Sequence, residues 1–423
     1  MFDLTTFIDR KYWLAFINYI IISRKINFIF NTNSRLGYAI LPYLKGKYPE
    51  IPIIDYIHME EWYNRNGGYS RDSSAVASVI DKTLVCNKNT ENILVEHFKR
   101  NRDEIKTVYI GVDEEKYNPK NSESKETILK KYNIVADDKF IISFICRISA
   151  QKRPHLLIKI IQKLKETRKD FLCVIAGDGE MLNEIKSKAK KYGLNDFIVF
   201  IGNIKETKEI YAISDITLNC SIKEGLALTS YESLAMGVPV ISSDVGGQKE
   251  LINDEVGVIV PCMQNEEDIL KFDYKEEEIE NYVKAINKVI DNINLYKEKC
   301  RAHILNGFTI KQMNNTINKI IEQIYISPNK EKISNGNGLT RNLEITKELI
   351  VMFFQENEKQ YEWQCKQYNS FYFNLKNQYE ETNFSKLSER LWKFKIYQVF
   401  IKLLQKTGIM KLIKIVLRRN NSQ

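Results

Sequence analysis

Two cations stand close together in the segment Cys146–Arg153, which reads CRISAQKR and directly follows an apolar run. Arg147 offers a planar fork of N–H donors and Lys152 a mobile point charge, so the two can neutralise a diphosphate. A phosphate-binding pair of this kind is expected at the carboxyl end of a strand. The same two charges are also compatible with an ordinary solvated pair in a surface loop, and the segment alone leaves both interpretations open.

Two acids follow at a spacing that suits a helix. Glu224 and Glu232 are eight positions apart, about two helical turns, so they lie near the same helical face. Gly225 permits close backbone approach, and the free N–H groups of a helix that begins near Leu228 can bind a phosphate. We expect Glu224 to accept hydrogen bonds from sugar hydroxyls and Glu232 to hold a ribose diol. The alternative is a helix-start acid followed by an ordinary helical glutamate.

Glycine and proline punctuate the chain after these acids. Gly237 predicts a helix end and Pro239 the start of the next strand. The pair Gly246-Gly247 predicts a turn. This turn either approaches a ligand or only reverses the chain.

Short apolar runs alternate with helical patterns on both sides of these residues, which indicates two parallel sheets covered by helices on both faces. The first block of predicted strands is Ile26–Asn31, Ile51–Ile57, Lys82–Cys86 and Ile105–Ile110, with helices at Thr5–Ser23 and Thr90–Arg100. The strands of the second block are Phe140–Cys146, Phe171–Ala176, Phe197–Ile201, Ile216–Asn219 and Val238–Ser242. Its helices are His155–Arg168, Met181–Tyr192, one through Tyr211, Leu228–Met236 and a group from Glu276 to about Tyr325. The second block predicts a doubly wound α/β domain.

Five motifs occur in order along this second block: RISAQKRP from Arg147, VIAGDGE from Val174, VFIGNI from Val199, YAISDITLNCS from Tyr211, and SIKEGLALTSYESLAMGVPVISSDVGG from Ser221. Together, and with Glu224 and Glu232 as an E-x7-E pair, they resemble the signature of glycosyltransferase family 4. The resemblance covers roughly Lys106–Tyr325.

The resemblance implies a GT-B fold, in which two Rossmann-like domains face a cleft, and a nucleotide-diphosphate sugar as donor. It also implies transfer with retention of anomeric configuration, with no cofactor and no obligatory metal; the sequence contains no D-x-D, which agrees with this. The implied donor-binding positions are Arg147, Lys152, Gly202, Ile204, Glu224, Gly225, Leu226, Ala227, Leu228 and Glu232.

Roles follow from the resemblance position by position. Arg147 and Lys152 would hold the diphosphate with help from backbone amides, Glu224 would contact the donor sugar and Glu232 the ribose. The loop Gly202–Ile204 would lie against the base. A further histidine is expected after a strand of the first domain.

That histidine is His58 in the run DYIH. The implied catalytic set is therefore Glu224, His58, Arg147 and Lys152. A packed, structural histidine is the alternative for His58.

The first domain departs from the family pattern because an opening apolar strand with a Gly-rich loop has no counterpart here. We expect a partial first domain, completed in one hypothesis by another polypeptide that covers the exposed sheet edge. Two segments rich in aromatics, Asn and Arg, Asn33–Tyr38 and Trp62–Arg71, suit an acceptor sugar or its phosphate. Ordinary surface loops are the alternative.

Net charge is concentrated at the end of the 423-residue chain. Residues 386–423 contain ten Lys and Arg and one acid, so this tail accounts for the whole net charge of +9. Apolar residues recur there at helical spacing, which predicts a cationic amphipathic helix at an anionic membrane surface. A helix packed on the protein with a basic outer face is the alternative. Nucleic-acid binding is disfavoured because the rest of the chain is neutral.

Cysteine usage points to a reducing compartment. The seven cysteines are scattered and none form C-x-x-C, which favours free thiols over disulfides or a zinc site. The early apolar stretch Tyr12–Ser23 is too short to span a bilayer. We therefore expect a cytoplasmic protein at the inner face of the membrane.

The sequence thus predicts an α/β protein with two Rossmann-like doubly wound domains, the first incomplete, plus a C-terminal helical extension. The predicted boundaries are 1–125, 126–327, a Gly/Asn-rich linker at 328–341, and 342–423. The predicted function is transfer of a sugar to a glycan or lipid-linked acceptor in surface polysaccharide or cell-wall glycan synthesis. The alternative is a non-catalytic or partner-dependent donor-domain subunit. A nicotinamide dehydrogenase is disfavoured because no G-x-G-x-x-G follows the first strand of either domain.

Overall fold

The structure, a computed structural model of the chain, describes residues 11–59, 68–136, 138–340, 343 and 350. Contacts gather Phe16–Lys347 into one compact unit that carries both sheets. The predicted basic tail at 386–423, nearly all of the helical segment predicted before it, and residues 62–67 of the second aromatic segment lie outside the described residues.

The first sheet contains four parallel strands in the same order as in the chain. They are β1 (Ile29–Thr32), β2 (Ile53–Ile57), β3 (Lys82–Val85) and β4 (Ile105–Thr107). The helices in this part of the chain are α1 (Lys11–Ser23), α2 (Arg35–Lys47), α3 (Gly68–Ala75) and α4 (Lys88–Glu96). Because each right-handed crossover steps in the same direction, α2, α3 and α4 cover one face of the sheet. We call these strands and helices the first lobe.

The two aromatic segments are only partly loops. Asn33–Tyr38 contains the start of α2, because the Ser34 side chain accepts a hydrogen bond from the N–H of Gly37 and caps the helix. The last residues of Trp62–Arg71 form the first turn of α3. The interpretation of Asn33–Tyr38 as a loop is therefore wrong for most of its length.

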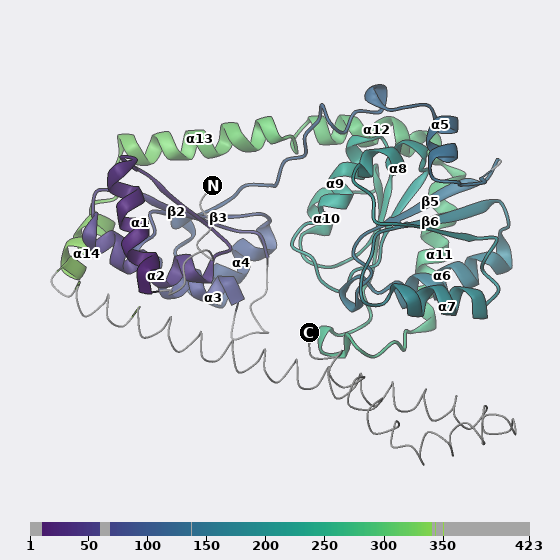
Figure 1. Cartoon of the computed structure of the whole chain (residues 1–423), viewed down its shortest axis with the longest axis horizontal. Helices are drawn as coiled ribbons and strands as arrows, with labels where there is room; N and C mark the ends of the chain where they lie inside the picture. Colours follow the sequence, from purple (N-terminus) through teal and green to yellow (C-terminus); the bar gives the residue numbers. More distant parts are fainter. Residues whose placement is uncertain (1–10, 60–67, 137, 341–342, 344–349, 351–423) are drawn as a thin grey trace, which may run out of the picture. The chain divides into compact units, whose positions relative to one another are not determined.

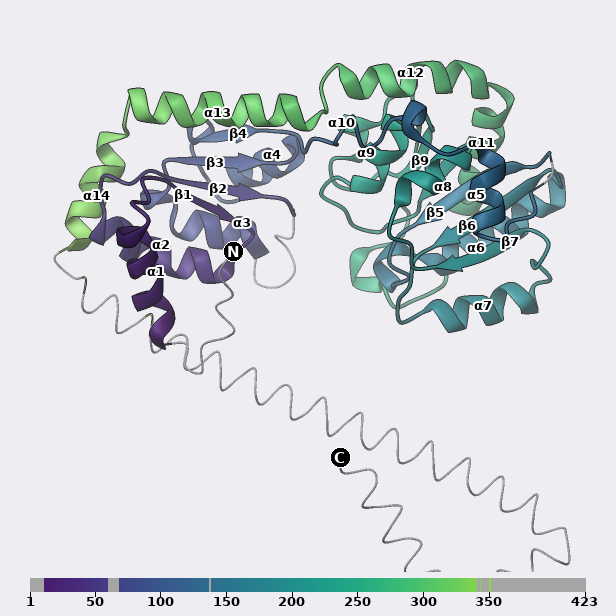
Figure 2. The ribbon, with the colours of Figure 1, turned by 45° about the horizontal axis from the view of Figure 1, so that its top comes forward.

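Helix α13 (Ile310–Ile326) covers the face of the first sheet that the crossovers leave open. Its apolar residues Ile317, Ile320 and Ile324 pack in one cluster with Ile54 and Leu84 of β2 and β3. Figure 2 shows α13 along one face of the strands and α2 and α3 along the other. Its amphipathic pattern predicts a helix but not which sheet the helix covers, so its expected place in the second domain differs from the sheet on which it packs.

The segment predicted as a Gly/Asn-rich linker is mostly helix α14 (Lys330–Thr340), so that prediction is wrong. Asn329 begins the helix by accepting hydrogen bonds from the N–H groups of Glu331 (3.1 Å) and Lys332 (3.2 Å). Lys332 then forms an ion pair with Glu104, with 2.7 Å between Nζ and Oε1. Gly336 allows close approach to α2, since a Cβ atom there would lie 2.7 Å from the carbonyl oxygen of Lys45.

The second sheet has six parallel strands in the order β10-β9-β8-β5-β6-β7. They are β5 (Phe140–Ile145), β6 (Phe171–Ala176), β7 (Ile198–Gly202), β8 (Ile216–Asn219), β9 (Val240–Ser243) and β10 (Gly257–Val260). Its helices are α5 (Lys125–Lys131), α6 (Pro154–Thr167), α7 (Leu182–Lys191), α8 (Thr207–Ile213), α9 (Leu228–Ala235), α10 (Gln248–Leu251), α11 (Glu276–Asp291) and α12 (Ile293–Leu305). Short 3-10 turns are η3 (Ala77–Val79), η4 (Arg102–Glu104), η5 (Pro119–Asn121), η6 (Ala150–Lys152) and η7 (Glu266–Asp268).

Each face of this sheet has its own apolar core, which confirms the predicted doubly wound domain. Helices α6, α7 and α11 contribute to one core and α8, α9 and α12 to the other (Figure 1). Gly237 ends α9 in the left-handed conformation at φ +77°, as its position predicts. We call this sheet and its helices the second lobe.

Two segments of the chain connect the lobes, and these segments contact each other. Val112 and Thr309 form an isolated parallel bridge. Gly111 is needed there, because a Cβ atom would lie 2.4 Å from the backbone N of Ile310. Thr309 then caps α13 in a capping box with Gln312. In the part of the chain that the structure describes, no helix has the length and apolar character needed to cross a membrane.

Candidate functional site

The strand order of the second sheet creates a crevice between β5 and β8. The chain leaves β5 toward β6 on one side and leaves β8 toward β9 on the other, so the loops after these two strands diverge. Ligands of doubly wound sheets bind at such a switch point, beyond the carboxyl ends of the strands. Arg147 and Lys152 lie in the loop after β5, and Glu224 and Gly225 in the loop after β8.

The loop after β5 is held against the end of β6 by two glycines. A Cβ atom would lie 1.9 Å from the carbonyl oxygen of Cys146 at Gly177, and 2.4 Å from that of Ile148 at Gly179. Both glycines also have positive φ. The loop therefore follows a fixed backbone path, on which the Arg147 side chain is exposed, with no bonded partner among the described residues.

A buried ion pair helps to connect the loop after β5 with the loop after β8. Arg153 donates from Nε to the carbonyl oxygen of Cys220 at 2.5 Å and from Nη1 to Oε1 of Glu278 at 2.8 Å. Both side chains are 1% exposed or less. Sequence reasoning missed this pair, since Arg153 looks like one more loop cation and Glu278 like one of three acids in the first turn of α11.

The charged side chains of the two loops meet directly. The Lys152 ammonium forms an ion pair with Glu224, and the Ser221 hydroxyl donates to the same carboxylate oxygen at 2.6 Å. Gln151 also donates from Nε2 to the carbonyl oxygen of Lys223 at 2.9 Å. The structure thus brings Lys152 and Glu224 together, 72 positions apart in the chain.

The N-terminus of α9 has no side-chain cap. Ala227 occupies the cap position and Leu228 begins the helix with half of its side chain exposed. Uncapped first-turn N–H groups attract an anion, because they point along the positive end of the helix dipole. This end follows Glu224 and Gly225 immediately and belongs to the same loop.

Glu232 lies on α9 among three hydroxyl groups. Its Oε1 accepts from Tyr117 at 2.8 Å, and its Oε2 accepts from Thr207 at 3.1 Å and from Tyr211 at 3.2 Å. Burial raises the pKa of the Glu232 carboxyl above its usual range, while these hydrogen bonds oppose the shift. The carboxylate is therefore held in one orientation by two residues of α8 and by a tyrosine of the segment before η5.

Gly202 is the last residue of β7, an edge strand of the sheet, and Ile204 follows that strand. Gly202 has φ +72° and accepts a hydrogen bond from the N–H of Gly177 at 2.7 Å, so this turn lies beside the loop after β6. Ile204 packs on the apolar core and is only partly buried.

His58 follows β2 in the first lobe, where Tyr56 lies beside it with 4.0 Å between ring centroids. Burial lowers the pKa of the His58 imidazole, which favours the neutral ring at neutral pH. A Cβ atom at Gly225 would lie 2.3 Å from the His58 carbonyl oxygen. The predicted histidine therefore lies directly beside the loop that carries Glu224.

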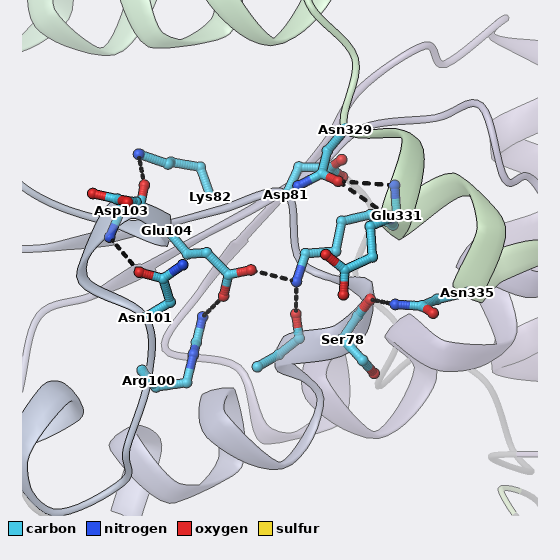
Figure 3. Close-up of polar contacts among 12 residues, drawn as sticks. Ser78, Asp81, Lys82, Arg100, Asn101, Asp103, Glu104, Asn329, Glu331 and Asn335 are labelled. Carbon is cyan, nitrogen blue, oxygen red and sulfur yellow. Dashed lines mark hydrogen bonds and ion pairs between the residues drawn. The ribbon is translucent and has the colours of Figure 1, made fainter.

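A cavity of about 370 Å³ lies elsewhere, at the opposite edge of the first sheet, where β3 and β4 begin. Asp81, Asp103, Glu104 and Glu331 are among its lining residues, and Figure 3 shows the polar contacts of the last three. It contains none of the predicted site residues. Within the described ranges, no three His, Cys, Asp or Glu side chains gather in a way that could hold a metal ion.

Comparison with known families agrees with the resemblance of the second lobe. Residues 124–306, less than half of the chain, match the family model described as Glycosyl transferases group 1. An uncharacterized glycosyltransferase of Methanocaldococcus jannaschii is 27% identical over 228 residues, which are 52% of this chain and 58% of the relative. The UDP-Gal:alpha-D-GlcNAc-diphosphoundecaprenol alpha-1,3-galactosyltransferase of Escherichia coli is 26% identical over 234 residues, which are 54% of this chain and 56% of the relative. The chain thus spans just over half the length of these two relatives.

Solved structures share the fold over more of the chain. A glycosyltransferase from Rickettsia africae superposes with a TM-score of 0.63 at 21% identity, covering 74% of this chain and 81% of its own. HepE of Anabaena, solved in complex with UDP-glucose, gives a TM-score of 0.58 at 15% identity over 73% of this chain and 81% of its own. The architecture is that of GT-B glycosyltransferases.

Proposed function

We propose that this chain is a group 1 glycosyltransferase of the family 4 type, which moves a hexose from a nucleotide-diphosphate sugar to a glycan or lipid-linked acceptor. The observation that carries the proposal is the meeting of Lys152, Glu224 and the uncapped start of α9 at the switch point between β5 and β8. Cations, a carboxylate and free amides at one such point suit a sugar joined to a diphosphate.

The diphosphate would be neutralised by Arg147 and Lys152 and by the first amides of α9. As the bond between sugar and phosphate breaks, negative charge grows on the departing diphosphate, and preorganised donors lower the barrier by stabilising that charge. Lys152 is paired with Glu224 in the structure. The donor would therefore enter between them, with its phosphate on the ammonium and its sugar hydroxyls on the carboxylate.

The nucleoside would extend toward Glu232 and the turn at Gly202–Ile204. In our proposal the ribose diol donates to the Glu232 carboxylate, whose position Tyr117, Thr207 and Tyr211 fix. The base lies against the turn after β7. In this E-x7-E arrangement, Glu224 would bind the donor sugar and Glu232 would bind the ribose.

His58 would act on the sugar side of the reaction. Its neutral ring can accept or donate one hydrogen bond to a sugar hydroxyl, and its backbone already touches the Glu224 loop. We propose transfer with retention of anomeric configuration and without a metal or other cofactor.

Named relatives support the choice of ligands. The Escherichia coli relative is a galactosyltransferase named for UDP-Gal and a diphosphoundecaprenol-linked acceptor, and the Anabaena structure is a complex with UDP-glucose. These names favour a uridine diphosphate sugar and a lipid-linked acceptor in surface polysaccharide or cell-wall glycan synthesis. We further propose that the chain works in the cytoplasm at the inner membrane face.

Calorimetry tests the donor assignment. The chain would be titrated with UDP, ADP and GDP and with their glucose, galactose and N-acetylhexosamine conjugates, and each conjugate would be assayed for hydrolysis and transfer. We expect saturable binding of one nucleoside diphosphate series and slow hydrolysis of its sugar conjugate. Binding without turnover by the purified chain would favour the partner-dependent subunit instead, and no binding by any of these compounds would refute the proposal.

A further inference from the structure

The ends of β2 and β3 in the first lobe lie against the loops that follow β8 and β9 in the second. Contact is so close that glycine is required on the second-lobe side. A Cβ atom at Gly247 would lie 2.6 Å from Cβ of Asn87. Within the second lobe, the loops after β8 and β9 are equally close, since a Cβ atom at Gly246 would lie 1.8 Å from the carbonyl oxygen of Glu224. Together with the contact between Gly225 and His58, these approaches fix the backbones of both lobes around the Glu224 loop.

Asn87 connects the two lobes through both ends of its amide. Its Oδ1 accepts from the N–H of Thr90 at 2.7 Å and caps α4, while its Nδ2 donates to the carbonyl oxygen of Gly225 at 3.0 Å. The N–H of Gly247 donates to the same carbonyl at 2.8 Å. Asn87 is fully buried.

Two donors thus fix the direction of one peptide group in the proposed donor loop. A trans peptide is planar, with its C=O and N–H pointing in opposite directions. Because the Gly225 carbonyl points toward Asn87 and Gly247, the N–H of Leu226 points the other way. Leu226 is one of the positions expected to present its amide to the donor.

Glu250 makes the second connection between the lobes. This residue of α10 accepts from the N–H groups of Lys88 (2.8 Å) and Asn89 (3.2 Å), the first residues of α4. Tyr109 also donates to Glu250 at 2.9 Å. A carboxylate at a helix N-terminus is electrostatically favourable, so α4 of the first lobe is bound by an acid of the second.

We infer that Asn87 and Glu250 are positioning residues, which hold the Gly225 peptide and the His58 strand end in one arrangement around the proposed donor site. The inference rests on the proposed function. Neither residue is expected to touch the donor, because their hydrogen-bonding groups are already directed at backbone groups and, for Glu250, at the Tyr109 hydroxyl. Nucleotide binding by the second lobe should survive their loss, whereas transfer should fall, since small misplacements of reacting groups are costly.

The variant Asn87→Asp separates positioning from capping. Asp caps a helix as well as Asn does, but its carboxylate has no N–H for the Gly225 carbonyl and repels it. A merely structural cap predicts normal turnover in this variant, and positioning predicts impaired turnover. Glu250→Gln serves the second contact, with Glu255→Ala as control, because Glu255 lies on the surface and pairs with exposed Lys299.

With UDP-glucose as first probe, we expect Asn87→Asp and Glu250→Gln to lower kcat about tenfold or more. We expect their Kd for UDP to stay within about threefold of the unaltered chain, and Glu255→Ala to match that chain throughout. Undiminished kcat in both Asn87→Asp and Glu250→Gln would overturn the inference.

Amide hydrogen exchange distinguishes failure of the inference from failure of the proposed function, because it needs no substrate. Peptides that contain Gly247, whose N–H donates to the Gly225 carbonyl, should exchange faster in Asn87→Asp, while those of α4 should keep their protection. If the unaltered chain bound no nucleotide, this result would still support the positioning of the Gly225 peptide. Unchanged exchange at Gly247 would overturn it.

Discussion

Lys152 is the cation whose contacts best explain its proposed role, because its ammonium lies on Glu224 at the mouth of the crevice. We predict that Lys152→Ala folds normally and loses about a hundredfold or more of its transfer rate, since one charge-stabilising donor is removed. The rate is measured with saturating donor and compared with Lys190→Ala, which removes an exposed lysine of α7. Near-normal turnover in Lys152→Ala would contradict the assignment of the diphosphate site.

For the residues of the candidate site, the sequence predicted which side chains would lie together but not the contacts that fix their positions. Arg147, Lys152 and Glu224 follow strand ends, and parallel strands bring their carboxyl ends to one edge. In the sequence Lys152 and Arg153 are two adjacent cations. The burial that distinguishes Arg153 depends on Glu278, in a helix 125 positions later. Likewise, the Asn87 contact with Gly225 spans 138 positions and leaves no local pattern.

Helix α11 provides a matched pair of glutamates for a stability test. Glu278 is buried against Arg153 with 1% of its side chain exposed, whereas Glu276, two positions earlier, pairs with Lys163 and is 63% exposed. We predict that Glu278→Ala lowers the free energy of unfolding by about 3–5 kcal/mol, because it leaves a buried guanidinium unpaired. Glu276→Ala should lower it by at most about 1 kcal/mol. Urea unfolding measures both, and equal effects would contradict a structural role for the buried pair.

Elements with continuous apolar runs were predictable, and those built around glycine or proline were not. Strand β6 has the predicted bounds, since Phe171–Ala176 is buried throughout. Helix α2 contains Pro42 and two glycines and still forms, because it packs on the sheet and on α14. The composition of helix α14 is that of a linker, yet one of its glycines, Gly336, allows it to lie close to α2. Tertiary packing outweighs local propensity at these places.

The charge distribution along the chain predicts that the protein binds a membrane and that only its basic tail does so. We predict that deletion of 386–423 moves the protein from the membrane fraction to the supernatant and leaves nucleotide binding by the second lobe unchanged. The tail holds the entire net charge of +9, and basic amphipathic segments bind anionic lipid through both charge and apolar area. Cosedimentation with vesicles of anionic and of neutral lipid measures the effect. Equal partitioning of the full and shortened chains would contradict it.

The two Rossmann-like sheets were predictable because strands and helices alternate along the chain whatever the order of the strands within each sheet. The linear order of the first sheet was not, since apolar runs carry no record of their neighbours. Because this order places all the crossover helices on one face of the sheet, the other face is covered by a helix from residues 310–326.

This cover has a consequence for biosynthesis. Domains usually fold in the order in which they leave the ribosome. Here the first sheet is translated early, but the helix that buries Ile54, Tyr56 and Leu84 emerges only after all six strands of the second sheet. The later-translated half can therefore mature first, while the earlier half waits with one apolar face open to chaperones and proteases. The two cores can thus be completed in the order opposite to that of translation.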